Sequence, residues 1–244
     1  MAIGNDVVDL TAARAKGMAE KHRFVERVFT RNERARILSG SDPDLEVWLA
    51  WAAKEAAYKV VSKLDGKAPV FEHRSFVVVW DEAGTSAERS HGGTVRHEGR
   101  TLRVWTAAER DAGYVHVLSW LTERPGTVPG DPAEGAPRGA RWTVERLDRP
   151  DAPWAGSYEA LTARLGERER DAVHSRPSAA VRIGARAEIA SVLGIDRDRT
   201  EIVCQPGRTG RRPPRILVDG TPATLDVSLS HDGPWIAWAL APLS

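Results

Sequence analysis

A segment rich in proline and glycine divides this chain into two parts of similar length. Residues 122–140, with the sequence TERPGTVPGDPAEGAPRGA, show no apolar period and have the composition of a linker. On each side of it the sequence predicts helices followed by strands. We therefore expect an α+β fold with two similar halves, each a helix packed on a small antiparallel sheet, over residues 1–121 and 141–244.

The predicted elements follow from apolar periodicity and from turn and cap signals. Helices are expected over 20–38, 43–64, 157–173 and 178–194. Strands are expected over 2–10, 75–80, 92–107 (folded at 97–100), 113–121, 141–147, 200–204, 215–218, 225–231 and 235–241. Asp232-Gly233, between the last two strands, is a strong hairpin signal.

Composition excludes several classes of protein. The net charge of +1 creates no general attraction to nucleic acid, and no aromatic-interleaved basic motif is present. No apolar run is long enough to cross a bilayer, and the first residues do not resemble a signal peptide. The single cysteine excludes an intrachain disulfide and is typical of a reduced cytoplasm.

The helix predicted over 43–64 has two distinct stripes. On a helical wheel its apolar stripe is formed by Leu45, Leu49, Ala53, Ala56, Val60 and Leu64. A second stripe contains Trp48, Trp51, Glu55, Lys59 and Ser62. Two indoles beside a carboxylate and an ammonium suit the wall of a cleft. Taken alone, however, Glu55 and Lys59 are more simply explained as an exposed, helix-stabilising i,i+4 pair.

Three motifs occur together in this chain: Gly4-Asn5-Asp6, the helix sequence WAAKEAAYK at 51–59, and Ser230-His231 before the hairpin. The set resembles the 4'-phosphopantetheinyl transferase superfamily. The resemblance implies two halves related by a pseudo-two-fold axis. It also implies transfer of the phosphopantetheine arm of coenzyme A to a serine of an acyl or peptidyl carrier protein, with release of 3',5'-ADP.

The resemblance also implies a magnesium site. Asp6 and Glu55 match the metal ligands of the family, and Glu33 matches a further acid that holds a metal-bound water. Some members carry an acid two residues after the Asp, where this chain has Val8. Asp9 points to the opposite face of the strand, so a water is expected in place of a third carboxylate.

Other matched residues would hold coenzyme A. Lys54 and Lys59 match phosphate-binding lysines, and Ser230 and His231 match groups that bind the coenzyme A phosphates. Either Lys59 or Glu55 could take the proton of the attacking serine, and the sequence leaves both open.

Arginines in the second half complete the predicted site. Residues 206–215, with four Arg and no acid, form either a disordered basic loop or a phosphate clamp, with Arg211 or Arg212 at the basic position of a family turn. Arg182 and Arg186, one turn apart on a predicted helix, are expected at the 3'-phosphate.

The order of the halves departs from the familiar two-repeat members, because the metal-binding half comes first here. A circular permutation and an independent tandem fusion both explain this order. One composite site between the halves, and therefore a monomer, is expected.

Residues 14–36 hold eight Lys or Arg against three Glu. They form either a solvated helix face or a docking patch for an acidic helix of the carrier protein. Two alternatives to this function remain: transfer to another acceptor, and an inactive homologue that binds coenzyme A or a carrier protein.

Overall fold

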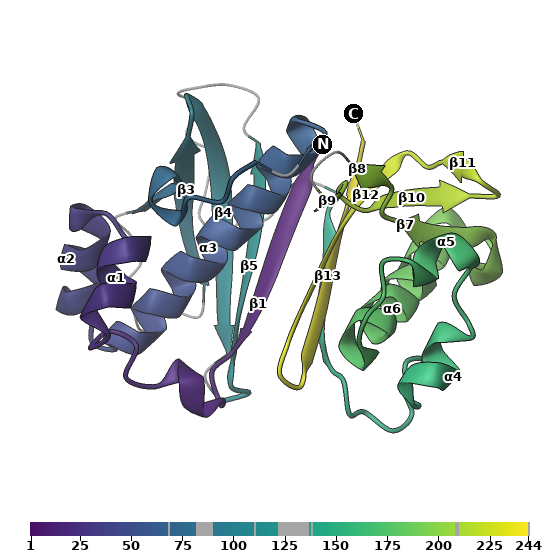
Figure 1. The fold of residues 1–244 in the computed structure, drawn as a ribbon, viewed down its shortest axis with the longest axis horizontal. Helices are drawn as coiled ribbons and strands as arrows, with labels where there is room; N and C mark the ends of the chain where they lie inside the picture. The colour runs from purple at the N-terminus through teal and green to yellow at the C-terminus, as the bar shows by residue number, and fades with distance from the viewer. Residues whose placement is uncertain are drawn as a thin grey trace.

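The computed structural model describes residues 1–67, 69–81, 90–109, 111–121, 137, 139–207 and 210–243. The predicted linker, residues 122–140, lies almost entirely outside the described residues. Two layers of strands meet at the centre of the molecule, and the helices lie on the outer sides (Figure 1). The α+β class predicted from the sequence is confirmed.

The first half forms one five-stranded antiparallel sheet covered by helices. The strand order is β1-β5-β4-β3-β2, and the first strand pairs with the last. The strands are β1 (Ile3–Asp9), β2 (Val77–Trp80), β3 (Ser90–His97), β4 (Arg100–Glu109) and β5 (Tyr114–Leu121). The helices are η1 (Ala13–Ala15), α1 (His22–Val28), α2 (Arg31–Ser39), α3 (Pro43–Leu64) and η2 (His73–Ser75).

The second half repeats this order of elements with smaller sheets. Its strands are β6 (Arg141–Arg146), β7 (Thr200–Val203), β8 (Pro206–Gly207), β9 (Gly210–Arg211), β10 (Arg215–Val218), β11 (Thr221–Pro222), β12 (Leu225–Asp232) and β13 (Trp235–Pro242). Its helices are α4 (Tyr158–Thr162), α5 (Glu167–Arg170), α6 (Arg176–Leu193) and η4 (Arg197–Arg199). The sheets have the orders β12-β13-β6, β11-β10-β7 and β8-β9. As in the first half, the first strand of the half, β6, pairs with the last, β13.

A buried ion pair fixes the long helix of the first half. Glu33, at the start of α2, accepts a hydrogen bond from the backbone N–H of Thr30 at 2.6 Å and another from Val78 of β2 at 2.8 Å. Its Oε1 also accepts from Lys54 Nζ of α3 at 2.7 Å. Three elements of the half therefore meet at one carboxylate.

The second half contains the same device. Glu169 of α5 accepts from the backbone N–H of Gly166 at 3.0 Å and of Ile202 in β7 at 2.8 Å. Its Oε2 also accepts from Arg186 of α6 at 3.1 Å. The match in partners makes α5, α6 and β7 the counterparts of α2, α3 and β2. This correspondence supports the two-repeat architecture through specific contacts as well as element order.

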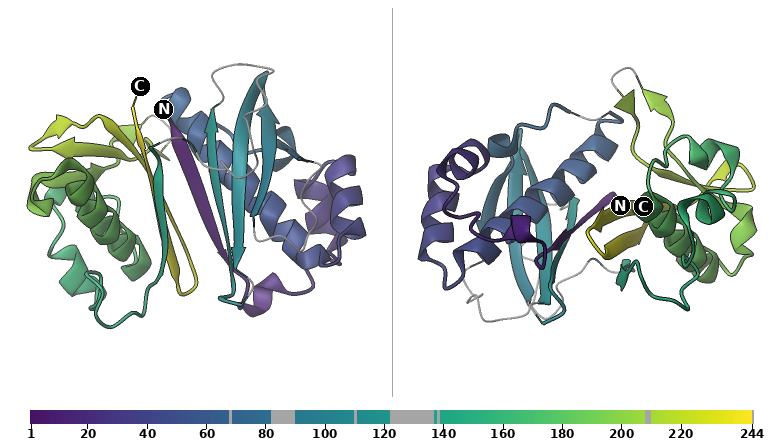
Figure 2. Two further views of the ribbon diagram at one scale, coloured as in Figure 1. Left: turned by 180° about the vertical axis from the view of Figure 1, so that it is seen from behind. Right: turned by 60° about the horizontal axis from the view of Figure 1, so that its bottom comes forward.

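The halves join along β1, β12 and β13. Buried apolar residues of both halves pack there: Ile3, Val7, Leu118, Trp235, Ala237, Ala239 and Ala241. The two ends of the chain lie side by side in each view (Figure 2). The amino group of Met1 donates a hydrogen bond to the carbonyl of Pro242 at 2.6 Å.

Several elements differ from the sequence-based expectation. The helix predicted over 20–38 is broken into α1 and α2, because Thr30 takes an extended conformation and caps α2. The helix predicted over 157–173 is broken into α4 and α5 in the same way, at the extended residue Gly166. The helix α3 matches its predicted bounds, although Leu64 of its apolar stripe is exposed at the helix end. Within the described residues, no helix is both long and apolar enough to cross a membrane.

Candidate active site

The Gly4-Asn5-Asp6 sequence places a carboxylate beside α3. Side chains alternate along a strand, so positions 4 and 6 of β1 face the same side. At position 4 the helix comes so close that a Cβ atom would lie 2.0 Å from the carbonyl oxygen of Ala56. Only glycine allows this approach. The close contact brings Asp6 against the face of α3 that carries Glu55 and Lys59.

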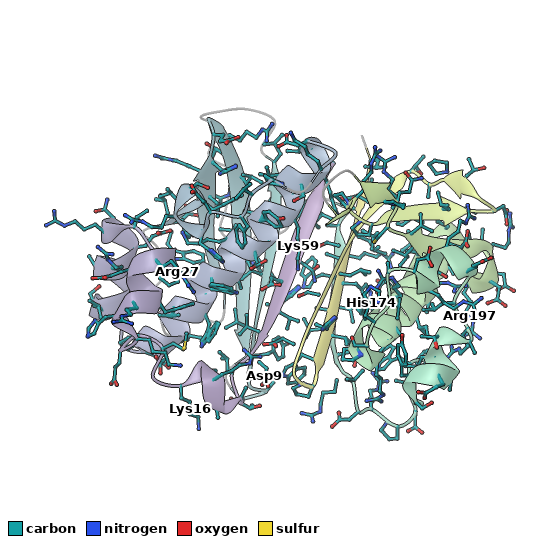
Figure 3. All side chains as sticks on the ribbon, viewed as in Figure 1. Asp9, Lys16, Arg27, Lys59, His174 and Arg197 are labelled. Atoms are coloured by element: carbon teal, nitrogen blue, oxygen red, sulfur yellow. The ribbon has the colours of Figure 1, made fainter. Side chains whose placement is uncertain are left out.

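Lys59 connects Asp6 with the second half. Its Nζ donates to the Asn5 carbonyl at 2.7 Å, to Asp6 Oδ1 at 3.0 Å and to the Leu229 carbonyl of β12 at 3.4 Å. Lys59 lies at the centre of the molecule, between the two halves (Figure 3). Its ammonium group is therefore in contact with three oxygen atoms, two from β1 and one from β12.

Ser230 of β12 completes the group around Asp6. Its Oγ donates to Asp6 Oδ1 at 2.8 Å and accepts from the backbone N–H of Val7 at 3.2 Å. The next residue, His231, has an exposed side chain. Partial loss of solvation, followed by the positive charge of Lys59, lowers its pKa and favours the neutral imidazole.

Glu55 carries a carboxylate with an unusual titration. Burial raises its pKa to about 7, the negative charge of Asp6 acts in the same direction, and Lys59 opposes both. Within the described part of the chain, no hydrogen bond reaches the Glu55 carboxylate. Asp6 and Glu55 are therefore close enough to repel each other, and a cation between them would relieve that repulsion.

A cavity of about 280 Å³ opens next to Lys59. Its walls are formed by α3, by β12 and by the turn that contains Arg212. A second cavity of about 490 Å³ adjoins it and shares Lys63 and Arg212. Two adjoining cavities with basic walls suit an elongated, phosphate-bearing ligand. The side chain of Arg211, the other predicted clamp residue, lies outside the described residues.

A family model described as the 4'-phosphopantetheinyl transferase superfamily matches residues 2–116. This part of the chain, slightly less than half of it, is similar to that superfamily. The match contains Asp6, Glu55 and Lys59 and ends before the second half begins. The family predicted from the three motifs is thereby confirmed.

Two curated relatives resemble parts of the chain. A holo-acyl-carrier-protein synthase of Protochlamydia amoebophila (strain UWE25) is 36% identical over 61 residues, which are 25% of this chain and 50% of the relative. The same enzyme of Chlamydia muridarum (strain MoPn / Nigg) is 33% identical over 66 residues, 27% of this chain and 53% of the relative. The chain thus spans about half the length of the curated relatives it matches.

Solved structures of the same kind of enzyme also match. The synthase of Thermotoga maritima gives a TM-score of 0.37 at 15% identity, with 68% of this chain and 74% of the other covered. That of Neisseria meningitidis gives 0.36 at 17% identity, with 50% and 98% covered.

Three predicted superfamily residues lie away from this site. Lys54 is fully buried, and its Nζ donates to Glu33 and to the carbonyls of His73 and Phe76 within the first half. All three contacts are internal, so Lys54 and Glu33 lie in the core and do not meet Asp6 or Glu55. On a helical wheel Lys54 lies about 100° from Glu55, so the two side chains leave the helix in different directions. The wheel does not show that the side of the helix carrying Lys54 is covered by other parts of the protein.

Arg186 is the third of these residues. Its guanidinium is held by Glu169 and by the carbonyls of Arg164 and Arg197. Arg197 lies on the outer side of the second half (Figure 3). Arg182, one turn earlier, has other partners: it donates to the Ser178 carbonyl at 3.1 Å. After burial and Lys59, its positive charge also helps to lower the pKa of His231. Its buried Nε has no partner in the described structure. Of the two arginines, Arg182 is therefore the one whose charge acts on a residue of the site.

The sequence analysis missed Lys63 and Asp226, which both line the larger cavity. They form an ion pair of 2.8 Å across the seam between the halves. The spacing Lys59-x-x-x-Lys63 was a usable signal, since the two side chains lie one turn apart on the same helix face. Among the described residues, no group of three or more His, Cys, Asp or Glu side chains converges.

Proposed function

We propose that this chain transfers the 4'-phosphopantetheine arm of coenzyme A to a serine of an acyl or peptidyl carrier protein. The serine oxygen forms a bond to the β-phosphorus of coenzyme A. The bond from that phosphorus to the oxygen bridging the two phosphates breaks, and 3',5'-ADP leaves. The serine proton passes to a base on the enzyme.

The observation that carries this proposal is the meeting of Asp6, Lys59 and Ser230 at one point. They come from β1, α3 and β12, and two of them bond to the same oxygen, Asp6 Oδ1. The motif that carries Ser230 is separated from the other two by most of the chain. A fold without this function has no need to bring a carboxylate, an ammonium and a Ser-His pair together beside a cavity.

Asp6 and Glu55 are the residues that would hold Mg²⁺. Burial, and after it the negative charge of Asp6, raises the pKa of Glu55, so a cation beside the two carboxylates would favour the ionised form of Glu55. Bound there, the ion would neutralise phosphate oxygens and reduce the repulsion met by an incoming hydroxyl. With Val8 two residues after Asp6, a water is proposed in place of a third carboxylate.

The contacts favour Glu55 over Lys59 as the base. An ammonium that donates to three oxygens has no lone pair left to accept a proton. Glu55 is therefore the candidate base, and in the protein without metal burial raises its pKa to about 7, close to neutral pH. Lys59 would instead bind a phosphate oxygen and hold it in position.

Coenzyme A would bind with its phosphates between the halves. Lys59 and Arg212 both line the smaller cavity, and Ser230 and His231 directly follow its lining residues Ser228 and Leu229 on β12. Arg182 approaches His231 from α6 and is the candidate for the 3'-phosphate. Guanidinium groups suit this task because they bind phosphate through two parallel hydrogen bonds.

The carrier protein would dock beside α1 and α2. Lys16 and Arg27 are exposed on this side of the first half (Figure 3). Arg14, Lys21, Arg23 and Arg31 of the same basic segment are exposed as well. An acidic carrier helix would be attracted to this surface, mainly through a faster encounter. The cytoplasmic location, the monomeric state and the permuted order of the halves stay predictions from the sequence.

The decisive experiment is intact mass measurement of an apo carrier protein after incubation with this protein, coenzyme A and Mg²⁺. We expect the carrier to gain the mass of phosphopantetheine. The gain should require the metal and should be lost in Asp6→Asn, while Arg199→Ala, an exposed position of the second half, should leave it unchanged. No gain on any acyl or peptidyl carrier would refute the proposal.

The two-carboxylate metal site favours one alternative function, an inactive homologue that binds coenzyme A. Calorimetry separates the two: binding of coenzyme A without any mass gain on carrier proteins would establish the alternative.

A further inference from the structure

The edge of β1 that faces the second half is closed by side chains. β1 pairs with β5 on one side only, and β12 pairs with β13, so the two strands present unpaired edges to each other. Alternate residues of β12 accept hydrogen bonds from alternate backbone N–H groups of β1. The pairs are Ile3 with Asp226, Asn5 with Ser228, Val7 with Ser230 and Asp9 with Asp232, at 2.8 to 3.2 Å.

Two lysines of α3 close the same seam through backbone carbonyls. Lys59 donates to the carbonyls of Asn5 and Leu229. Lys63, one turn later, donates to the carbonyls of Ile3 at 2.7 Å and Val227 at 2.6 Å. Each lysine thus links β1 to β12, and the second link lies two residues earlier on both strands.

Asp226 belongs to both sets of contacts. Its Oδ2 accepts from the Ile3 N–H and from Lys63 Nζ, each at 2.8 Å. The side chains of Lys63 and Asp226 are 9% and 12% exposed. With three oxygens around its Nζ and little solvent contact, Lys63 is poorly placed to exchange these partners for a ligand.

The counterpart positions in the second half carry no lysine. Because Arg186 corresponds to Lys54, the counterparts of Lys59 and Lys63 are Ser191 and Ile195. Neither side chain can form such a bridge. The lysine links are therefore specific to the seam that carries the candidate site and are not a general requirement of the repeat.

We propose that Lys63 and Asp226 are positioning residues, which fix β12 against β1 so that Ser230 and His231 stand opposite Asp6 and Glu55. This inference rests on the proposed function, because it assigns these residues to its site. Coenzyme A would bind groups from both halves, so its binding needs the correct register between them. Docking of the carrier protein, which would contact only the first half, does not depend on that register.

The test compares the KM values for the two substrates. Lys63→Met and Asp226→Asn should raise the KM for coenzyme A about tenfold and leave the KM for the carrier protein unchanged. Lys63→Arg, which keeps the positive charge, should restore the KM for coenzyme A to within about threefold of the original value. The dissociation constant of coenzyme A, measured by calorimetry, should follow its KM.

A matched control breaks an ion pair within one half. Arg100 and Asp65 join β4 to the end of α3 at 2.7 Å, entirely inside the first half. Arg100→Met should change neither KM. Thermal unfolding followed by circular dichroism identifies any variant that fails to fold, and Asp226→Asn, the isosteric change, then decides the question.

Two results would overturn the positioning role. The first is an unchanged affinity for coenzyme A in folded Lys63→Met and Asp226→Asn. The second is that Lys63→Met and Arg100→Met change the KM values of both substrates equally. Failure of the proposed function gives a different result, in which the unaltered protein transfers no phosphopantetheine. The affinity for coenzyme A would then still show whether Lys63 and Asp226 position the two strands. If the unaltered protein neither transfers nor binds coenzyme A, both proposals are wrong.

Discussion

Replacing Glu55 by glutamine should make the metal-free protein less sensitive to rising pH. Glu55 has a pKa of about 7 in the folded protein against 4.5 for the free side chain. A raised carboxyl pKa means that the folded state holds the proton more tightly, so the stability it provides is lost as pH rises from about 4.5 through 7. Glutamine stays neutral and does not show this loss.

The magnitude follows from the size of the shift. The full difference corresponds to about 3.4 kcal/mol at ~1.36 kcal/mol for each pKa unit, of which roughly 2 kcal/mol falls between pH 5.5 and 8.5. Because Glu55 is partly exposed to solvent, which screens its charge, we expect about 1 kcal/mol in that window.

The assay is urea unfolding of both proteins at pH 5.5 and 8.5, first in a chelator and then with Mg²⁺. In the chelator, Glu55→Gln should gain about 1 kcal/mol relative to the unaltered protein as the pH rises. Mg²⁺ should reverse the order at pH 8.5, because it binds the carboxylate and not the amide. Identical pH dependence of the two proteins in chelator would show that Glu55 is not perturbed as described.

Two further predictions concern the buried pair and the cavity. Lys54→Met should lower the free energy of unfolding in urea by about 3–5 kcal/mol, because it leaves Glu33 buried without its cation. Lys54→Met combined with Glu33→Gln should recover much of that loss. Equal destabilisation by the single and the double change would contradict the pairing. Arg212→Ala should raise the KM for coenzyme A about tenfold with kcat nearly constant, since it removes a phosphate contact present throughout the reaction, whereas the control Arg199→Ala should leave both constants unchanged. A fall in kcat alone for Arg212→Ala would place the guanidinium at the reacting phosphorus instead.

Local patterns predicted most of the elements because their causes are local. The hairpin at Asp232-Gly233 forms where the sequence predicts it, with Gly233 at a φ of +53°. The helix α6 ends at Gly194 in the left-handed conformation, as its composition indicates. The two breaks that sequence reasoning missed lie at Thr30 and Gly166, where the carboxylate three residues later bonds back to the chain.

The site was predictable only as a set of residues. The motifs correctly brought together Asp6, Lys59 and Ser230, because the family resemblance carries their joint geometry. Resemblance did not separate Lys54 from Lys59, or Arg186 from Arg182, since adjacent turns of one helix look equivalent in sequence. Which side of each helix is covered depends on contacts with elements far away in the chain, and no local pattern encodes those contacts.

The three lysines of α3 show how burial divides one residue type into three roles. Lys54, Lys59 and Lys63 each donate hydrogen bonds to three oxygens. Most sides of the helix are covered by protein, and a buried cation needs such partners in place of water. Their side chains are 0%, 27% and 9% exposed. A ligand phosphate can reach an ammonium only where solvent does, and displacing a long contact costs less than displacing a short one. Lys59 meets both conditions, with its bond of 3.4 Å to Leu229 facing the cavity. Lys54 holds the helix within the first half and Lys63 holds the two halves together. We infer that, of the three, only Lys59 would change partners when a ligand phosphate binds.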